Sequence, residues 1–318
     1  MKIHHLNTGT MCPMSRRLVS GTGGLFQRAR TVCHCLLIEI HDGLALVDTG
    51  IGLGDIATPD RLGKRWLRQT APKLDPAETA VRQVKALGYS PTDVRHVLLT
   101  HLDRDHAGGV PDFPHAAIHV HRAEHDTAVL RKPAPPEGRY ITGQWSHGPS
   151  WKFYGEAGED WFGFKGVRAL GDREADILMI PLAGHTLGHC GIAVRSGDKW
   201  LLHAGDSYFH HAQLDASPRA PLVLRYFQRK VDMDRDRRRV LCAGCQRETE
   251  CCYREMFHPR HLLCRRVLRL QPGVERREII EHGLRVEVVF AGHFFQRLLP
   301  RLRLPGFQHR SKLCARLL

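Results

Sequence analysis

The sequence predicts an α/β protein, because strand-like and helix-like segments follow one another along the chain. Short apolar runs such as Cys33–Ile40 and Val94–Leu99 have the length and composition of buried strands. Pro76–Leu87 carries apolar residues at helical spacing and is followed by Gly88, which can close a helix. Polar, glycine-containing loops follow several of the strands, and functional residues are expected in such loops.

Eight strands and three helices are expected in chain order. His41–Gly43 and Ser196–Asp198 are predicted turns, since Asp and Gly adopt the backbone angles of tight hairpins. Arg131–Pro136 contains too many prolines to continue a helix. The strands are Cys33–Ile40, Leu44–Val47, Val94–Leu99, Ile118–His121, Ile177–Leu182, Cys190–Val194, Trp200–His203 and Val286–Phe290. The helices are Pro76–Leu87, Arg122–Leu130 and Val223–Arg239.

Length and composition narrow the class of protein. The 318 residues, of which 42% are hydrophobic, suffice for one large domain or two modest ones. No stretch approaches eighteen uninterrupted apolar residues, which argues against a membrane-spanning helix. Residues 1–20 lack the apolar core of a signal peptide, so we expect a cytoplasmic protein whose ten cysteines are thiols or metal ligands.

Positive charge and cysteine are concentrated near the C-terminus. The net charge is +14, but residues 235–318 hold 19 Lys and Arg against 8 Asp and Glu, a net of +11. Six of the ten cysteines follow residue 241. The composition therefore predicts a near-neutral globular domain over residues 1–239 and a basic, cysteine-rich region over residues 240–318. In one interpretation that region is an atypical completion of the same domain.

The strongest chemical signal is the loop that follows the third predicted strand. Within six residues of Thr100–Gly109 lie four potential metal ligands: His101, Asp103, Asp105 and His106. Side chains this close on a tight loop can point at two neighbouring positions, and the two glycines let the backbone turn sharply beside them. Imidazole nitrogen and carboxylate oxygen together suit zinc, and also iron or manganese.

Three further polar residues stand directly after predicted strands. Asp48 precedes Thr49-Gly50, His185 lies in a Gly-His-Thr-Leu-Gly-His run, and Asp206 follows Gly205. A two-metal site needs about seven or eight protein ligands supplied in this way. The sequence therefore predicts a metal centre made from loops at strand ends.

Together these motifs resemble those of the metallo-β-lactamase superfamily of metal-dependent hydrolases. The family's second motif is His-x-His-x-Asp-His, often followed by Ala-Gly-Gly, and residues 101–109 are similar to it. Its Gly-His-Thr-x-Gly-His run looks like Gly184–His189, and its aspartate after an apolar strand looks like Asp206. The resemblance covers roughly residues 1–235 and four of the family's five motifs.

The resemblance implies a four-layer αββα sandwich with a metal site on loops at one edge of the sheets. By analogy with the family, one metal would bind His101, the residue at position 103 and His185. The other metal would bind Asp105, His106 and a histidine that follows a late strand.

Two aspartates have implied roles beside these ligands. Asp206 would bridge the metals, and Asp48 would orient ligands by hydrogen bonds. Asp103 departs from the family pattern, because histidine is commonest at that position. It either ligates or leaves the first metal with fewer protein ligands.

The late histidine departs from the family pattern as well. The best candidate is His293, which follows the predicted strand Val286–Phe290 but precedes Phe294 instead of the family's aspartate. We expect two zinc ions, with iron or manganese as alternatives.

Residues from about Val240 onward look foreign to the family, and three interpretations compete. The region is a genuine C-terminal variation, a small metal-binding insertion around Cys242 and Cys245, or the translation of a shifted reading frame. The cysteine spacing matches no standard zinc ribbon. We favour the shifted frame, because charge and cysteine content change abruptly together.

The resemblance implies hydrolysis of an ester, lactone or thioester by a metal-bound hydroxide, as in lactonases and proteins resembling glyoxalase II. A metal lowers the pKa of bound water to about 7, and Asp105 would orient that nucleophile as the catalytic residue. The alternative is a noncatalytic or single-metal member whose divergent C-terminal region has lost part of the site.

The expected partner is a small-molecule substrate, whose identity stays open, as does the oligomeric state. We expect no membrane partner. We expect no nucleic-acid partner either, because the basic tail lacks a groove-binding motif and interleaved aromatic residues.

Overall fold

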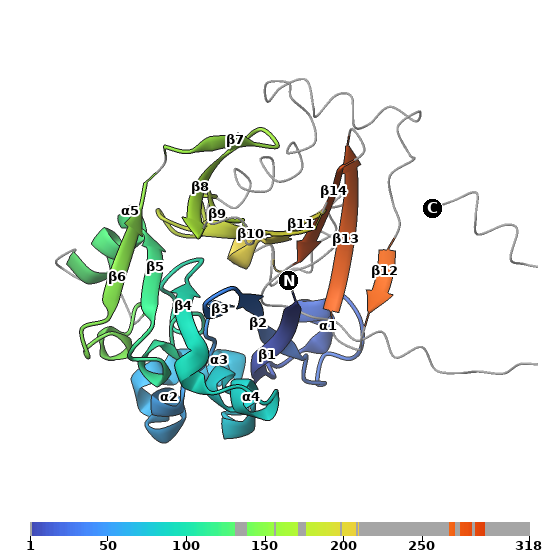
Figure 1. Ribbon diagram of the computed structural model, residues 1–318. Coiled ribbons are helices and arrows are strands. Elements are labelled where there is room, and N and C mark those ends of the chain that lie inside the picture. Colours follow the sequence, from blue (N-terminus) through green and yellow to red (C-terminus); the bar gives the residue numbers. More distant parts are fainter. Residues whose placement is uncertain are drawn as a thin grey trace, which may run out of the picture.

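The structure is a computed structural model. It describes residues 2–130, 139–155, 157–170, 176–197, 199–207 and 209, together with three strands between residues 267 and 289. Two β-sheets face each other (Figure 1). The first sheet comes from the N-terminal half of the chain, and helices lie on its outer face.

The first sheet has the order β1-β2-β3-β4-β5-β6. The first three strands pair antiparallel, whereas β3 to β6 are parallel neighbours. The C-terminal ends of these parallel strands therefore meet at one edge, where loops can bring polar residues together. The strands are β1 (Ile3–Met11), β2 (Thr31–Ile40), β3 (Gly43–Val47), β4 (Val94–Leu98), β5 (Ala117–His121) and β6 (Ser150–Tyr154).

The second sheet has the order β12-β13-β14-β11-β10-β9-β8-β7. Its pairs are antiparallel except for β11 and β14, which run parallel with His203 beside Val289. The strands are β7 (Glu159–Trp161), β8 (Phe164–Leu170), β9 (Ile177–Pro181), β10 (Cys190–Ser196), β11 (Lys199–His203), β12 (Val267–Leu270), β13 (Val274–Glu281) and β14 (Leu284–Val289).

The described residues form five α-helices, which are short and join the strands. Three of them, α2 (Leu53–Ala57), α3 (Lys64–Thr70) and α4 (Ala80–Ala86), lie on the outer face of the first sheet (Figure 1). The others are α1 (Arg16–Ser20) and α5 (Arg122–His125). In the part of the chain that the structure describes, no helix has the length and apolarity needed to cross a membrane. Single helical turns are η1 (Pro59–Leu62), η2 (Pro76–Glu78), η3 (Pro91–Asp93), η4 (Val110–Asp112), η5 (Asp126–Leu130), η6 (Thr142–Gln144) and η7 (Gly205–Ser207).

Strand β2 shows how the sequence places two cores on the two faces of one sheet. Successive side chains in a strand point to opposite faces. Leu36 and Ile38 therefore pack between the sheets with Ile192, whereas Leu37 packs with Val84 of helix α4. All five side chains are fully buried, so the apolar run of β2 is explained by burial on both sides.

The two sheets with helices outside agree with the predicted α/β sandwich, but several elements differ. The predicted helix Pro76–Leu87 is divided into η2 and α4, because Thr79 between them has an extended backbone. β1, β6 to β8, β12 and β13 were not predicted, since polar residues interrupt the apolar pattern of most of them. The predicted helix Val223–Arg239 lies outside the described residues.

Candidate metal centre

Asp48 and the loop after β4 meet because β3 and β4 are parallel neighbours. Val47 lies beside Leu98, so Asp48 and Thr100 leave adjacent strands at the same edge. The backbone N–H of Thr100 donates to Asp48 Oδ1 over 2.8 Å. Asp48 has a left-handed backbone with φ 55, which aspartate tolerates better than most residues. A residue other than glycine keeps a left-handed backbone only where the surrounding structure holds it there.

The carboxylate of Asp48 fixes the protonation of two histidines. Its Oδ2 accepts hydrogen bonds from His106 Nδ1 and from Thr100 Oγ1, both over 2.8 Å. Because the Thr100 hydroxyl proton is used, its oxygen accepts a hydrogen bond from His101 Nδ1 at 2.9 Å. Each neutral imidazole therefore carries its proton on Nδ1 and has a free lone pair on Nε2.

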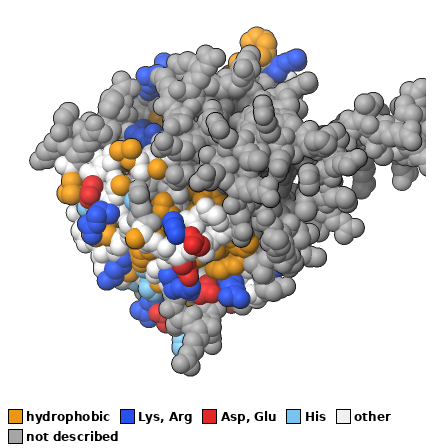
Figure 2. All heavy atoms as spheres, turned by 90° about the horizontal axis from the view of Figure 1, so that it is seen from above, with side chains coloured by type: hydrophobic (Ala, Val, Ile, Leu, Met, Phe, Trp, Pro, Cys, Tyr) orange, Lys and Arg blue, Asp and Glu red, His pale blue; other side chains and the backbone are white. Residues whose placement is uncertain are grey.

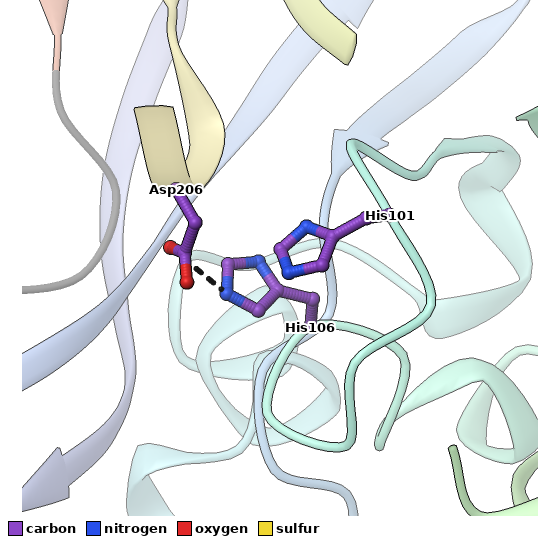
Figure 3. A group of neighbouring side chains, drawn as sticks. All are labelled: His101, His106 and Asp206. Atoms are coloured by element: carbon purple, nitrogen blue, oxygen red, sulfur yellow. Dashed lines mark ion pairs between the residues drawn. The ribbon is translucent and has the colours of Figure 1, made fainter. Parts of the chain in front are cut away.

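His101, His106 and Asp206, here called the His106 group, are close enough to share an ion (Figure 3). One ligand atom from each lies within 4.8 Å of the others, and His106 Nε2 is 3.3 Å from Asp206 Oδ1. His101 Nε2 and Asp206 Oδ1 are buried without a hydrogen-bond partner among the described residues. Buried acceptors that face one another without a donor need a cation, so these residues fit a metal ion.

The carboxylates of Asp48 and Asp206 make the space around His106 favourable for positive charge. Burial alone would lower the pKa of His106, but Asp206 and Asp48 on either side raise it well above its usual value. Burial alone would raise the pKa of Asp206, but His106 and other nearby histidines hold it well below its usual range. A proton or a metal ion beside His106 satisfies the same demand for charge.

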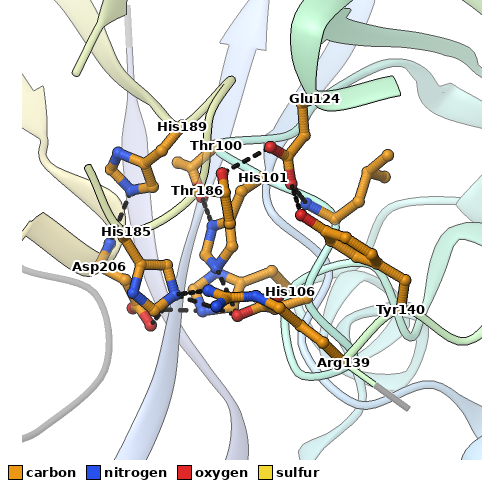
Figure 4. Close-up of polar contacts among 12 residues, drawn as sticks. Thr100, His101, His106, Glu124, Arg139, Tyr140, His185, Thr186, His189 and Asp206 are labelled. Carbon is orange, nitrogen blue, oxygen red and sulfur yellow. Dashed lines mark hydrogen bonds and ion pairs between the residues drawn. The ribbon is translucent and has the colours of Figure 1, made fainter. Parts of the chain in front are cut away.

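His101, Asp103 and His185, here called the His185 group, form a second set of potential ligands. Asp103 Oδ2 is 3.4 Å from His101 Nε2 and 3.0 Å from His185 Nε2. Arg139 reaches into this group, as Figure 4 shows. Its Nε donates to Asp103 Oδ1 over 2.5 Å, and its Nη2 donates to His185 Nε2 over 2.7 Å. Burial alone would raise the pKa of Asp103, but Arg139 and His101 hold it well below its usual range.

Asp206 belongs to the His106 group and also approaches the His185 group. Its Oδ1 faces His106, and its Oδ2 is 3.4 Å from His185 Nε2. The backbone N–H of Asp206 donates to His189 Nε2 over 3.0 Å, which fixes where the carboxylate begins. The preceding Gly205 has φ 53, and a Cβ there would lie 2.6 Å from His189 Nε2, so only glycine fits.

Glu124 joins three loops around the site (Figure 4). Its Oε1 accepts hydrogen bonds from Leu102 N at 2.9 Å and from Tyr140 Oη at 3.2 Å. Its Oε2 accepts from Thr186 Oγ1 at 2.5 Å and from Gly188 N at 3.2 Å. The side chain is fully buried and these four donors satisfy it, so Glu124 holds the loops of both groups together.

The structure brings five of the seven predicted ligands together. Asp105 is partly buried on the same loop but belongs to neither group. His293 lies outside the described residues. The five that converge are His101, Asp103, His106, His185 and Asp206.

The glycines of the loop act differently from the prediction. Neither Gly108 nor Gly109 has a positive φ. A Cβ on Gly108 would lie 2.4 Å from Asp55 Oδ2 and 2.5 Å from the carbonyl oxygen of Gly50. Glycine is therefore needed for close approach of the loop to its neighbours, and not for a sharp turn.

Three residues of the site carried no role in the sequence analysis. His189 lies in the Gly-His-Thr-Leu-Gly-His run, so its motif offered a signal for its importance. Glu124 and Arg139 are single charged residues far from the motifs in the chain. No local pattern distinguishes them, because their partners become neighbours only through the fold.

The chain belongs to the metallo-beta-lactamase superfamily, whose family model matches residues 28–244. It is accordingly a metal-dependent hydrolase, as that family resemblance implied. A probable metallo-hydrolase of Mycobacterium tuberculosis is 41% identical over 241 residues, which are 75% of this chain and 73% of that protein. An N-acyl homoserine lactonase of Rhizobium johnstonii is 32% identical over 185 residues, covering 54% of this chain and 64% of that protein.

Solved structures confirm the fold. An N-acyl homoserine lactone hydrolase with bound N-hexanoyl-L-homoserine superimposes with a TM-score of 0.53 at 21% identity, covering 72% of this chain and 86% of that one. A probable metal-dependent hydrolase from Staphylococcus aureus superimposes with a TM-score of 0.52 at 19% identity, covering 75% and 82%.

Proposed function

We propose that this protein hydrolyses a lactone or a related ester or thioester at a zinc site that includes the His106 group. The observation that carries the proposal is the convergence of His101 Nε2, His106 Nε2 and the Asp206 carboxylate, with the Nδ1 atom of each histidine already engaged in a hydrogen bond. The relatives named N-acyl homoserine lactonase favour a lactone over the other carboxylic esters. A small-molecule lactone is therefore the proposed substrate class.

Zinc is the proposed metal, because imidazole nitrogen and carboxylate oxygen are ligands that it prefers. Iron or manganese would suit the same donors, so metal analysis must decide. A divalent ion supplies two things when bound, an acidified water and a Lewis acid for the substrate oxygen. Binding of the two expected ions would require the His185 group, which Arg139 contacts, to bind one of them.

The chain's own residues prepare the site in three ways. Asp48 keeps His101 and His106 oriented with their Nε2 lone pairs available. His189 positions the backbone of Asp206, and Glu124 holds the surrounding loops. Asp105 remains the proposed residue for orienting the attacking water. His293 remains a proposed ligand, supported by the parallel pairing of β14, the strand that precedes it in sequence, with β11.

The proposed partner is a small molecule and not a nucleic acid. Figure 2 shows basic, acidic and apolar side chains interspersed over the described part of one face. On β7 and β8, Lys165 pairs with Asp160 and Arg168 pairs with Glu159. Cytoplasmic location and the domain boundary at residue 239 stay predictions, which cell fractionation and limited proteolysis would test.

Removal of the metal tests the proposed function. We expect dialysis against a chelator to abolish hydrolysis of an acyl homoserine lactone, and zinc to restore it. His106→Ala should lower kcat/KM at least 100-fold, whereas His115→Ala, at an exposed histidine, should leave it unchanged. Turnover that survives both chelation and His106→Ala would refute the proposal.

A further inference from the structure

The guanidinium of Arg139 lies against the potential ligand atoms of the His185 group (Figure 4). Its guanidinium donates to Asp103 Oδ1 and to His185 Nε2. The side chain is 32% exposed, while those of Asp103 and His185 are 14% and 8% exposed. The guanidinium therefore covers the group at its more exposed side.

One lone pair decides what His185 can bind. Arginine offers only N–H donors, so Nε2 of His185 accepts in the 2.7 Å hydrogen bond with Arg139 and cannot at the same time donate to Asp103 Oδ2, which lies 3.0 Å away. A metal ion would need the same lone pair, at about 2.0–2.1 Å from the nitrogen. The guanidinium and a metal ion are therefore alternatives at this atom.

An aspartate at position 103 is suited to binding the guanidinium of Arg139 as the cation of this group. A carboxylate pairs with a guanidinium through charge and hydrogen bonds, and Asp103 does so at 2.5 Å. Histidine, the commonest residue there in the resembled family, would offer Arg139 no opposite charge. The ion pair with Arg139 therefore accounts for an aspartate, and not a histidine, at position 103.

The His106 group differs in this respect. Within the described ranges, the ion pairs and hydrogen bonds of His106 and Asp206 side chains involve Asp48 and His185 but no arginine or lysine. Among the described residues, no arginine or lysine supplies positive charge to this group, whereas Arg139 supplies it to the His185 group. A bound metal ion can therefore supply the charge at the His106 group, while the guanidinium already does so at the other group.

We propose that Arg139 replaces one of the two metal ions, so that each chain binds a single divalent ion at the His106 group. The guanidinium supplies the charge at the His185 group that a second ion would supply. This inference rests on the proposed metal site but concerns how many ions it takes.

Metal stoichiometry tests the inference without any activity assay. Full-length wild type, Arg139→Ala and Arg139→Gln are dialysed against excess Zn²⁺, and bound zinc per folded chain is measured by mass spectrometry. Each protein is compared with the same protein carrying His106→Ala and His185→Ala. Zinc held by residues 240–318 then cancels. Arg68→Ala, at an exposed arginine of α3, is the matched control.

We expect one zinc above the reference in wild type and in Arg68→Ala, and two in the folded Arg139 variants. Two zinc ions in wild type would overturn the inference while leaving the proposed function intact. One zinc in wild type and also in both Arg139 variants would overturn it too, because Arg139 would not be what excludes the second ion. No zinc above the reference in any protein would instead refute the metal site itself.

Discussion

Asp48 is the residue on which the orientation of both histidines of the His106 group depends. It contacts His106 directly and His101 through Thr100. Burial alone would raise the pKa of Asp48, but His106 and other histidines hold it below its usual value, so the carboxylate stays ionised and accepts hydrogen bonds from its neighbours. A single buried charge therefore leaves two nitrogen lone pairs available.

Replacing this charge should weaken metal binding. In Asp48→Asn the amide cannot accept all the hydrogen bonds that the carboxylate accepts, so the ligand histidines lose their fixed protonation. We expect zinc affinity to fall about 10–100-fold, measured by competition with a chromophoric chelator. Asp42→Asn, at an exposed aspartate, serves as control, and equal affinities for the two variants would contradict this role.

Asp112 gives the protein a pH-dependent stability that is independent of the metal. Burial raises the pKa of Asp112 to about 6, while the unfolded chain has a value near 3.8. The folded state therefore holds the proton more tightly, and its stability falls as pH rises from about 4 to about 6.

The variant Asp112→Asn should remove this dependence, because an amide oxygen can still accept the hydrogen bond from Leu53 N. We expect the variant to be more stable than wild type by about 2–3 kcal/mol at pH 7 and close to it in stability near pH 4. Urea unfolding at the two pH values measures this. A stability difference that does not change with pH would show that ionisation of Asp112 is not responsible.

At the scale of elements, the site depends on loops that leave the two sheets at one edge. Parallel β3 and β4 bring Asp48 to Thr100, and β11 carries Asp206. Glu124 lies in α5, the helix that directly follows β5. It connects the loop of His101 with the loop of His185. The position of the ligands is therefore a property of several elements together.

Glu124→Gln tests that connection. Glutamine has the same shape as glutamate, but one of its two polar atoms is an NH2 group. That group is a donor, so it cannot accept the hydrogen bonds that the carboxylate oxygen at its place accepts. We expect the free energy of unfolding to fall by about 1–3 kcal/mol. The rate of the proposed lactone hydrolysis should fall as well, because Glu124 no longer holds both loops in place. Chemical denaturation and steady-state kinetics measure the two effects. Glu159→Gln, in an exposed ion pair, should change stability by less than about 1 kcal/mol.

The sequence was sufficient for the parts of the site that are local. His101 to His106 lie within six residues after an apolar strand, so spacing alone indicated a metal site. Arg139 and Glu124 could not be predicted, because their partners are 16 to 64 residues away in the chain. β1 was missed for a similar reason: its polar residues are accommodated by pairing with β2, which no local pattern reveals.

At the scale of the whole molecule, the unusual composition of the C-terminal region bears on the second sheet. β12 to β14 extend that sheet beyond β11, and these three strands contain no cysteine and equal numbers of arginine and glutamate, unlike residues 240–318 as a whole. That the region completes the same domain stays a prediction. The shifted-frame interpretation stays a prediction, and resequencing the gene would test it.

X-ray absorption at the zinc edge of the purified protein tests the central claim most directly, because it reports the metal's own neighbours. Convergence of His101, His106 and Asp206 predicts nitrogen and oxygen ligands at about 2.0–2.2 Å, with the scattering pattern of imidazole. Sulfur ligands at about 2.3 Å would place the metal among cysteines and contradict the account.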